Sequence, residues 1–245
     1  RLNPVGIDVM FVSTADNSGV DIPNENIDRS ILMFAYLLQG DMTKTYSYLK
    51  WHDNLLDLMV EATSAIQDSE REAMIMTRVS ALYSTGTYSI TGRDNTNNIH
   101  AEWVGVDAVG QHSDMLTKNY QDLNLESLVT LITESQRNGR VFFVDNAHDG
   151  MRHQYDLGAC LDADAELLSQ IEGVEIVYLG MAREMGNSPL YIVEMAFYVC
   201  TMYPEIAQSI GLDYEDLFYE YFELFASSEY WLNLDIEDFF LVRQG

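Results

Sequence analysis

Arginine, histidine and tyrosine side chains gather in three polar segments, each of which follows an apolar run. Five of these residues are candidates for contact with a ligand: Tyr88, Arg93, His148, Arg152 and Arg183. Arginine offers a planar set of N–H donors that suits carboxylate or catecholate-like oxygen. Tyrosinate and imidazole can coordinate ferric iron or haem iron. These residue types predict a site for an anionic or iron-containing ligand.

Four apolar runs predict the buried strands that would position these side chains. They span residues 6–12, 73–82, 140–145 and 174–179. Each run is followed by a polar or glycine-containing loop and then by a helical pattern, which favours an α/β fold with a parallel, doubly wound sheet. Ligands bind outside the carboxyl ends of such strands. We therefore expect the site to lie on the four loops that follow: residues 13–23, 83–98, 146–158 and 180–187.

Two helices are predicted between the first two strands, over residues 26–39 and 42–66. Gly40 suits the end of the first helix, and Asp41 suits the N-cap of the second. The second helix would be roughly 35–40 Å long, since each residue adds 1.5 Å. This length exceeds what one sheet layer needs, and such a helix could join two lobes. The alternative is a long packing helix within one domain.

Near the end of the chain, Ser188 followed by Pro189 predicts the start of a helix that continues over residues 190–202. This helix is apolar nearly all round except for Glu194, so we expect it to be buried, with Cys200 as an ordinary core residue. Asp213 is the predicted N-cap of a further helix over residues 214–225.

Composition and motifs exclude several functional classes. The 13 basic and 39 acidic residues give a net charge of −26, which repels nucleic acid and anionic membrane surfaces. An acidic surface with few lysines is typical of a salty habitat or of a device for solubility, and both alternatives stay open. No apolar run is long enough to span a bilayer. No P-loop, GxGxxG, GxSxG, HExxH or CxxC motif is present, so we do not expect an enzyme.

Several short stretches resemble the iron–siderophore, haem and cobalamin binding proteins of ABC importers. The closing part carries VEIVYLG (174–180), GNSPLY (186–191), MYPE (202–205) and EYFELF (220–225). Upstream, IHAEWVGVDAV (99–109) is similar to the family's helix that ends in Ala-Gly-Gly-x-Asn-Val, and GIDVMFV (6–12) is similar to its Gly-Ile-Pro-Val strand. Two features depart from the family. Most of its first lobe is missing before residue 6, and QRNG (136–139) stands where it has Asn-Pro-Asp.

The resemblance implies two α/β lobes joined by one rigid helix, with the ligand between them. Residues 1–41 would be the remainder of the N-terminal lobe, 42–66 the linking helix and 67–245 a complete C-terminal lobe. The expected ligand is an iron chelate, haem or a corrinoid, and no cofactor of the protein's own is implied. The expected partner is the permease of an ABC importer, at an extracytoplasmic location with a possible lipid anchor upstream of Arg1. The alternative is a surface interaction or sensory protein that kept this fold without transport.

Overall fold

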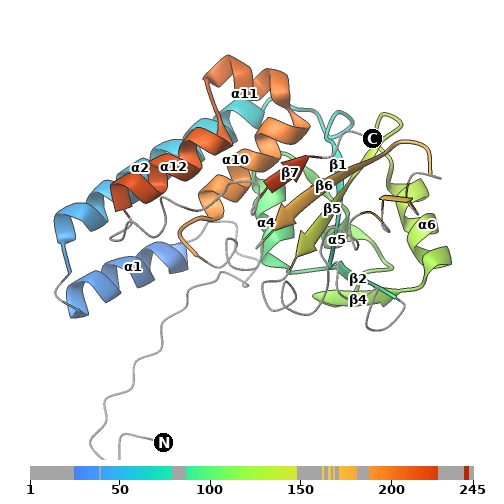
Figure 1. Cartoon of the computed structure of the whole chain (residues 1–245), viewed down its shortest axis with the longest axis horizontal. Helices are drawn as coiled ribbons and strands as arrows, with labels where there is room; N and C mark the ends of the chain where they lie inside the picture. Colours follow the sequence, from blue (N-terminus) through green and yellow to red (C-terminus); the bar gives the residue numbers. More distant parts are fainter. Residues whose placement is uncertain are drawn as a thin grey trace, which may run out of the picture.

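The structure is a computed structural model, in which one sheet is flanked by helices on both faces (Figure 1). It describes residues 25–38, 40–78, 87–147, 162, 165–166, 168, 171–180, 188–225 and 240–242. The predicted strand over residues 6–12 lies outside this part of the chain. Within it, no helix combines the length and the apolar character that crossing a membrane requires.

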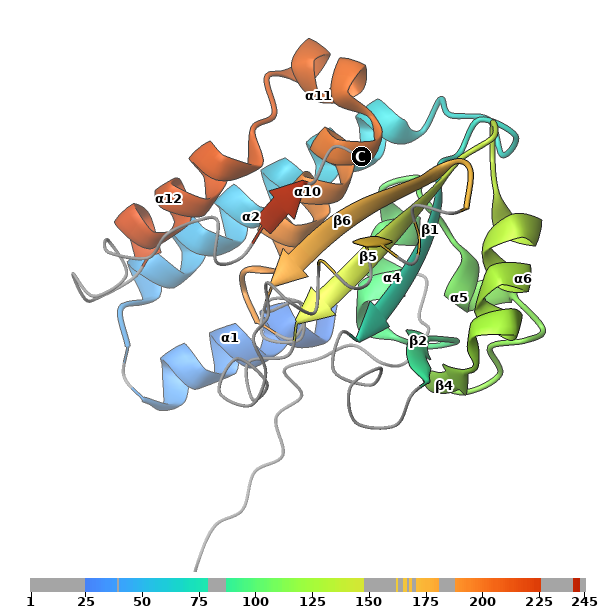
Figure 2. The ribbon, with the colours of Figure 1, turned by 45° about the vertical axis from the view of Figure 1, so that its right-hand side comes forward.

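In the described part of the chain, α4 (Thr96–Trp103) packs on one side of the sheet together with five helices from the two ends of that part. These five are α1 (Glu25–Leu37), α2 (Met42–Thr63), α10 (Tyr191–Met202), α11 (Pro204–Ile210) and α12 (Tyr214–Phe225). Both ribbon views place α2 and α12 side by side, with α1 below them (Figures 1 and 2). The predicted N-caps of α2 and α12 are confirmed, because Asp41 accepts from the amides of Thr43 and Lys44, and Asp213 caps α12 in the same way. Helix α2 ends at Thr63 rather than at residue 66.

The start of α10 differs from the prediction by two residues. Ser188 accepts a hydrogen bond from the amide of Leu190 at 3.2 Å, but it lies in a turn that precedes the helix. Leu190 occupies the N-cap position and makes no side-chain cap. Pro189 therefore belongs to this turn and not to the first turn of α10.

Seven strands make one sheet with the order β4-β2-β1-β5-β6-β7, and β3 pairs with β1 outside this path. The strands are β1 (Ala73–Arg78), β2 (Tyr88–Thr91), β3 (Asp107–Ala108), β4 (Tyr120–Leu123), β5 (Val141–Ala147), β6 (Val174–Gly180) and β7 (Phe240–Val242). The helices α4 (Thr96–Trp103), α5 (Val109–His112) and α6 (Leu125–Ser135) lie between them in sequence. The α/β fold class is confirmed.

The prediction of a purely parallel sheet is wrong at the edges. Strands β3, β1, β5 and β6 are parallel, but β2, β4 and β7 run antiparallel to their neighbours. The parallel centre was predictable because its strands are buried on both faces, which gives continuous apolar runs. The antiparallel strands are short, and β4 carries the polar sequence YQDL, so no apolar run marks it.

Successive side chains of the central strands point to opposite faces and enter two separate cores. Met74, Met76 and Phe142 face α2, α4 and α10–α12, whereas Ile75 and Phe143 lie in the core with α6. Helix α2 packs on the first core through Tyr48, His52, Met59 and Thr63, while Trp51 and Leu55 are partly buried against it. The division at residues 41 and 66 into two lobes and a linking helix stays a prediction.

Candidate ligand-binding edge of the sheet

The parallel strands β1, β5 and β6 end at the same edge of the sheet, where ligands bind in open α/β folds. The register aligns Thr77 with Asp145, and Asp145 with Tyr178. Figure 2 shows the arrowheads of β5 and β6 close together at this edge. The side chains of Thr77 and Asp145 are fully buried there, and the Thr77 hydroxyl donates to the carbonyl of Ser89 at 3.3 Å. The edge therefore carries buried polar groups beneath the loops that follow the strands.

Tyr88 is the first residue of β2 and lies beside the carboxyl end of β1. It is only 2% exposed, and its ring packs edge-on against Phe143 with centroids 6.5 Å apart. Its ring thus contributes to the core below the edge.

Arg93 lies in an exposed turn at the other end of β2. Because β2 runs antiparallel to β1, the chain between Tyr88 and Arg93 leads back along the sheet, away from the carboxyl edge. The prediction that residues 83–98 form one loop is therefore wrong for 88–91, which form β2, and for 96–98, which begin α4. The Arg93 guanidinium donates to the carbonyl of Gln111 at 3.3 Å. A Cβ at Gly92 would lie 2.0 Å from the carbonyl oxygen of Lys118, so only glycine fits where this turn begins.

His148, Arg152 and Arg183 lie outside the described residues, on the segments that follow β5 and β6. The convergence of the five candidates on one surface therefore stays a prediction. Among the described residues, no group of three or more histidine, cysteine, aspartate or glutamate side chains is placed to hold a metal ion.

A buried polar cluster joins α4 to α10. Glu194 is fully buried, and its Oε1 accepts from the Asn97 amide at 2.7 Å and from the Tyr198 hydroxyl at 2.6 Å. Its Oε2 lies 3.7 Å from Nδ1 of His100. Burial and the neighbouring Glu194 carboxylate raise the pKa of Tyr198 well above its usual value. The only sign of this cluster in the sequence is a single glutamate in an otherwise apolar helix.

Two buried histidines enclose Tyr191, the first residue of α10. His100 stacks on the Tyr191 ring with centroids 4.8 Å apart, and the Tyr191 hydroxyl hydrogen-bonds to Nε2 of His52 on α2. The other ring nitrogen of His52 contacts Asp53 at 3.1 Å. These contacts attach α2 to α10 and α4, so His52 has a structural role in the core.

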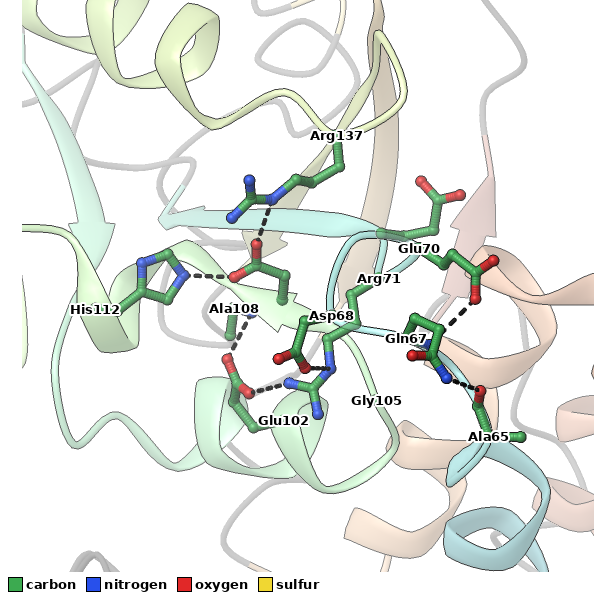
Figure 3. Close-up of polar contacts among 12 residues, drawn as sticks. Ala65, Gln67, Asp68, Glu70, Arg71, Glu102, Gly105, Ala108, His112 and Arg137 are labelled. Carbon is green, nitrogen blue, oxygen red and sulfur yellow. Dashed lines mark hydrogen bonds and ion pairs between the residues drawn. The ribbon is translucent and has the colours of Figure 1, made fainter.

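The opposite, amino edge of the sheet holds a network of ion pairs (Figure 3). Arg137 donates from Nε to Asp107 at 2.8 Å, and His112 bonds to the other oxygen of the same carboxylate. Burial raises the pKa of Asp107, but the hydrogen bonds from His112 and Arg137 outweigh it, so the net shift is downward. The hydrogen bond to Asp107 raises the pKa of His112.

Three further carboxylates at this edge are paired. Arg140 donates to both oxygens of Glu72, at 2.9 and 2.6 Å, and to Glu175 at 3.1 Å. Glu102 accepts from Arg71 and from the amide of Ala108, while burial raises the pKa of its carboxyl. Sequence reasoning did not find this network, because its members are distributed from residue 71 to residue 175.

Comparison with known proteins identifies the architecture. Neither a protein-family model nor a curated protein sequence matches the chain. Among solved structures, the TroA-like periplasmic binding protein FepB from Veillonella parvula superimposes with a TM-score of 0.66 at 12% identity, over 91% of this chain and 63% of that one. The chain has the fold of a TroA-like periplasmic binding protein.

Two further structures share this TroA-like fold. The molybdate periplasmic binding protein MolA of Haemophilus influenzae, solved with bound molybdate, gives a TM-score of 0.62 at 12% identity, over 93% of this chain and 68% of that one. A periplasmic haem-binding protein from Pseudomonas aeruginosa gives 0.51 at 13% identity, over 83% and 66%. The chain thus spans about two thirds of the length of these proteins. The resemblance predicted from short motifs is confirmed at the level of the fold.

Proposed function

We propose that the chain is part of an extracytoplasmic solute-binding protein that delivers a metal chelate to an ABC importer. The expected chelate is a ferric siderophore, haem or cobalamin. The observation that carries this proposal is the TroA-like fold, which extends over 91% of the chain. The proposed location, possibly with a lipid anchor, and the permease as partner both depend on the same likeness.

The placement of arginine donors supports a site at the carboxyl edge. The sequence has a net charge of −26, yet His148, Arg152 and Arg183 lie on the segments that directly follow β5 and β6. The same segments carry Asp149, Asp156 and Glu184, so the guanidinium donors of Arg152 and Arg183, and not the net charge, would recognise an anionic chelate. At the amino edge, by contrast, Arg137 and Arg140 are already paired with carboxylates.

The fold does not define the ligand class, because one similar structure is a haem-binding protein and another binds molybdate. The sequence places Tyr155 and His148 near Arg152 on the segment after β5, and phenol and imidazole groups suit iron or its chelates. We therefore expect a chelate to bind more tightly than a bare oxyanion.

Absorbance and tryptophan-quenching titrations test the proposal directly. The full chain is titrated with haemin, a ferric hydroxamate, a ferric catecholate, cyanocobalamin and molybdate. We expect saturable binding of one chelate, and Arg152→Ala or Arg183→Ala should weaken it by roughly ten- to a hundred-fold. Arg137→Ala removes the same charge at the opposite edge and is the matched control.

Three results would count against the proposal. They are the absence of binding to every chelate, tight binding of molybdate alone, and a loss of chelate affinity in Arg137→Ala equal to that in Arg152→Ala or Arg183→Ala. The alternative, an interaction or sensory protein without transport, predicts that no permease and ATPase genes lie beside the gene for this chain.

A further inference from the structure

A pocket of about 250 Å³ opens between α1, the start of α2, the turn before α10 and the end of α12. Its walls are apolar and come from Ile31, Tyr48, Pro189, Tyr221 and Phe225, and Lys44 lies at the rim. Binding pockets for small molecules are mostly apolar with a few polar groups that orient the ligand. This volume is at the small end of that class and suits a molecule with a single ring.

Ring contacts and hydrogen bonds fix the aromatic side chains that line the pocket. The rings of Tyr48 and Phe225 meet edge-on at 5.4 Å, those of Tyr48 and Tyr221 at 6.3 Å, and Trp51 packs against Phe225 at 5.5 Å. The Tyr48 hydroxyl donates to the carbonyl of Pro189 at 3.1 Å, and the Trp51 indole donates to Glu220 at 3.0 Å. The rings are therefore organised before any ligand binds, which lowers the entropic cost of binding.

The polar groups of the pocket divide into satisfied and unsatisfied ones. Asp41 accepts from the amides of Thr43 and Lys44, and the Thr45 hydroxyl donates to the carbonyl of Asp41. Within the described part of the chain, the Lys44 ammonium and the Tyr221 hydroxyl have no hydrogen-bond or ion-pair partner. Burial raises the pKa of Tyr221, so its hydroxyl keeps the proton that it can donate.

Asp41 also lines the pocket, but its carboxylate faces the first amides of α2, which offset its negative charge. Lys44 and Tyr221 therefore decide the sign of the ligand. An ammonium can only donate, and it carries a positive charge. A cation or a bare hydrocarbon would leave Lys44 unused, whereas a carboxylate could accept from both Lys44 and Tyr221.

We propose that this pocket binds a small aromatic carboxylate, with its ring between the aromatic walls and its carboxylate beside Lys44 and Tyr221. This site is bounded by helices and does not depend on the proposed delivery of a chelate.

Isothermal titration calorimetry of the full chain with benzoate and phenylacetate tests this site, with benzamide as the uncharged counterpart of benzoate. We expect at least one acid to bind with a Kd below about 1 mM and benzamide to bind at least about five-fold more weakly, because it lacks the charge. Lys44→Met should lower the affinity for the acid by roughly five- to ten-fold, and Tyr221→Phe should lower it by about two- to five-fold. Lys50→Met, a change of the same kind on an exposed position of the same helix, should leave the affinity unchanged.

The proposal is overturned if neither acid binds at millimolar concentration, if benzamide binds as tightly as benzoate, or if Lys44→Met and Lys50→Met behave alike. Thermal unfolding of each variant establishes that it is folded, and Tyr221→Phe retains the ring that packs against Trp51. A chelate that binds normally to Lys44→Met would separate this pocket from the site of the proposed transport function.

Discussion

The amino edge of the sheet and the cluster around Glu194 both contain carboxylates that are largely removed from water. The two regions stabilise these carboxylates in different ways. Glu72 and Asp107 lie near the surface and pair with arginines that remain more than a third exposed. Glu194 is fully buried and accepts hydrogen bonds from the neutral side chains of Asn97 and Tyr198. Solvent therefore screens the first group, whereas the second depends on fixed geometry.

This difference predicts a ranking of energetic effects. Exposed ion pairs contribute little, because water competes for the charges. Removal of one partner from a buried polar cluster costs much more, because the remaining groups stay unsatisfied. The four changes below test this ranking from the largest expected effect to the smallest.

Glu194→Ala should lower the free energy of unfolding by about 3–5 kcal/mol, because it leaves Asn97, Tyr198 and a cavity behind. Urea denaturation measures the change. Glu205→Ala is the matched control, since Glu205 also lies in the first turn of its helix but is exposed, and it should cost less than about 1 kcal/mol. Equal effects in the two variants would contradict the distinction between the regions.

Tyr203→Phe should lower the free energy of unfolding by about 2 kcal/mol. The Tyr203 hydroxyl accepts from the amide of Glu72 at 2.9 Å and donates to the carbonyl of Gly105 at 2.7 Å, so its loss leaves two buried backbone groups unpaired. Burial raises the pKa of this hydroxyl to about 12, so it stays protonated during the measurement near neutral pH. Tyr219→Phe, at an exposed position on α12, should change the stability by less than about 0.5 kcal/mol.

Arg140→Met should cost about 1–2 kcal/mol, because Glu72 is nearly buried and loses both of its hydrogen bonds to the guanidinium. Arg93→Met removes an exposed arginine with a single bond to a carbonyl, and it should cost about 0.5 kcal/mol or less. If Arg93→Met lost as much stability as Arg140→Met, the contact of Arg140 with both oxygens of Glu72 would contribute nothing beyond that of an exposed arginine. Chemical denaturation at low and high salt measures the loss of unfolding free energy in both variants and shows how much of each loss salt screens.

The pair of His112 and Asp107 should show the smallest effect and a defined dependence on pH. The raised pKa of His112 means that its contribution is present below about pH 6.5 and is lost as the pH rises through the higher value in the folded protein. The lowered pKa of Asp107 means that its contribution is present above about pH 4 and is lost as the pH falls through the folded value. The pair should therefore stabilise the protein most at about pH 4–6.5.

His112→Gln tests this window. The difference in unfolding free energy from the original protein should be about 0.5 kcal/mol at pH 5 and should decline as the pH rises towards 9. Arg137→Met should show no such decline, because arginine keeps its charge over this range. A His112→Gln difference that grew with pH would contradict the assigned direction of the shift.

The sequence alone was sufficient for the elements whose stability has a local signature. The strands β1, β5 and β6 are buried on both faces and stand out as apolar runs, and Asp41 and Asp213 mark the starts of α2 and α12 through contacts within three residues. The α/β class follows from these elements and from their order, whereas the likeness to the binding proteins of ABC importers came from the resemblance of short stretches such as VEIVYLG (174–180).

Only the tertiary structure decided the features that depend on partners far apart in the chain. The short strand β2 exists because it pairs with β1 and β4, and its antiparallel direction leads Arg93 away from Tyr88, although the two are close in sequence. The hydrogen bond between Asn97 and Glu194 spans 97 residues. The pocket beside Lys44 likewise needs α1, α2, α12 and the turn before α10, which come from both ends of the described chain. The physical reason is that each of these contacts is stabilised by groups that folding alone brings together, so no local pattern of residues marks them.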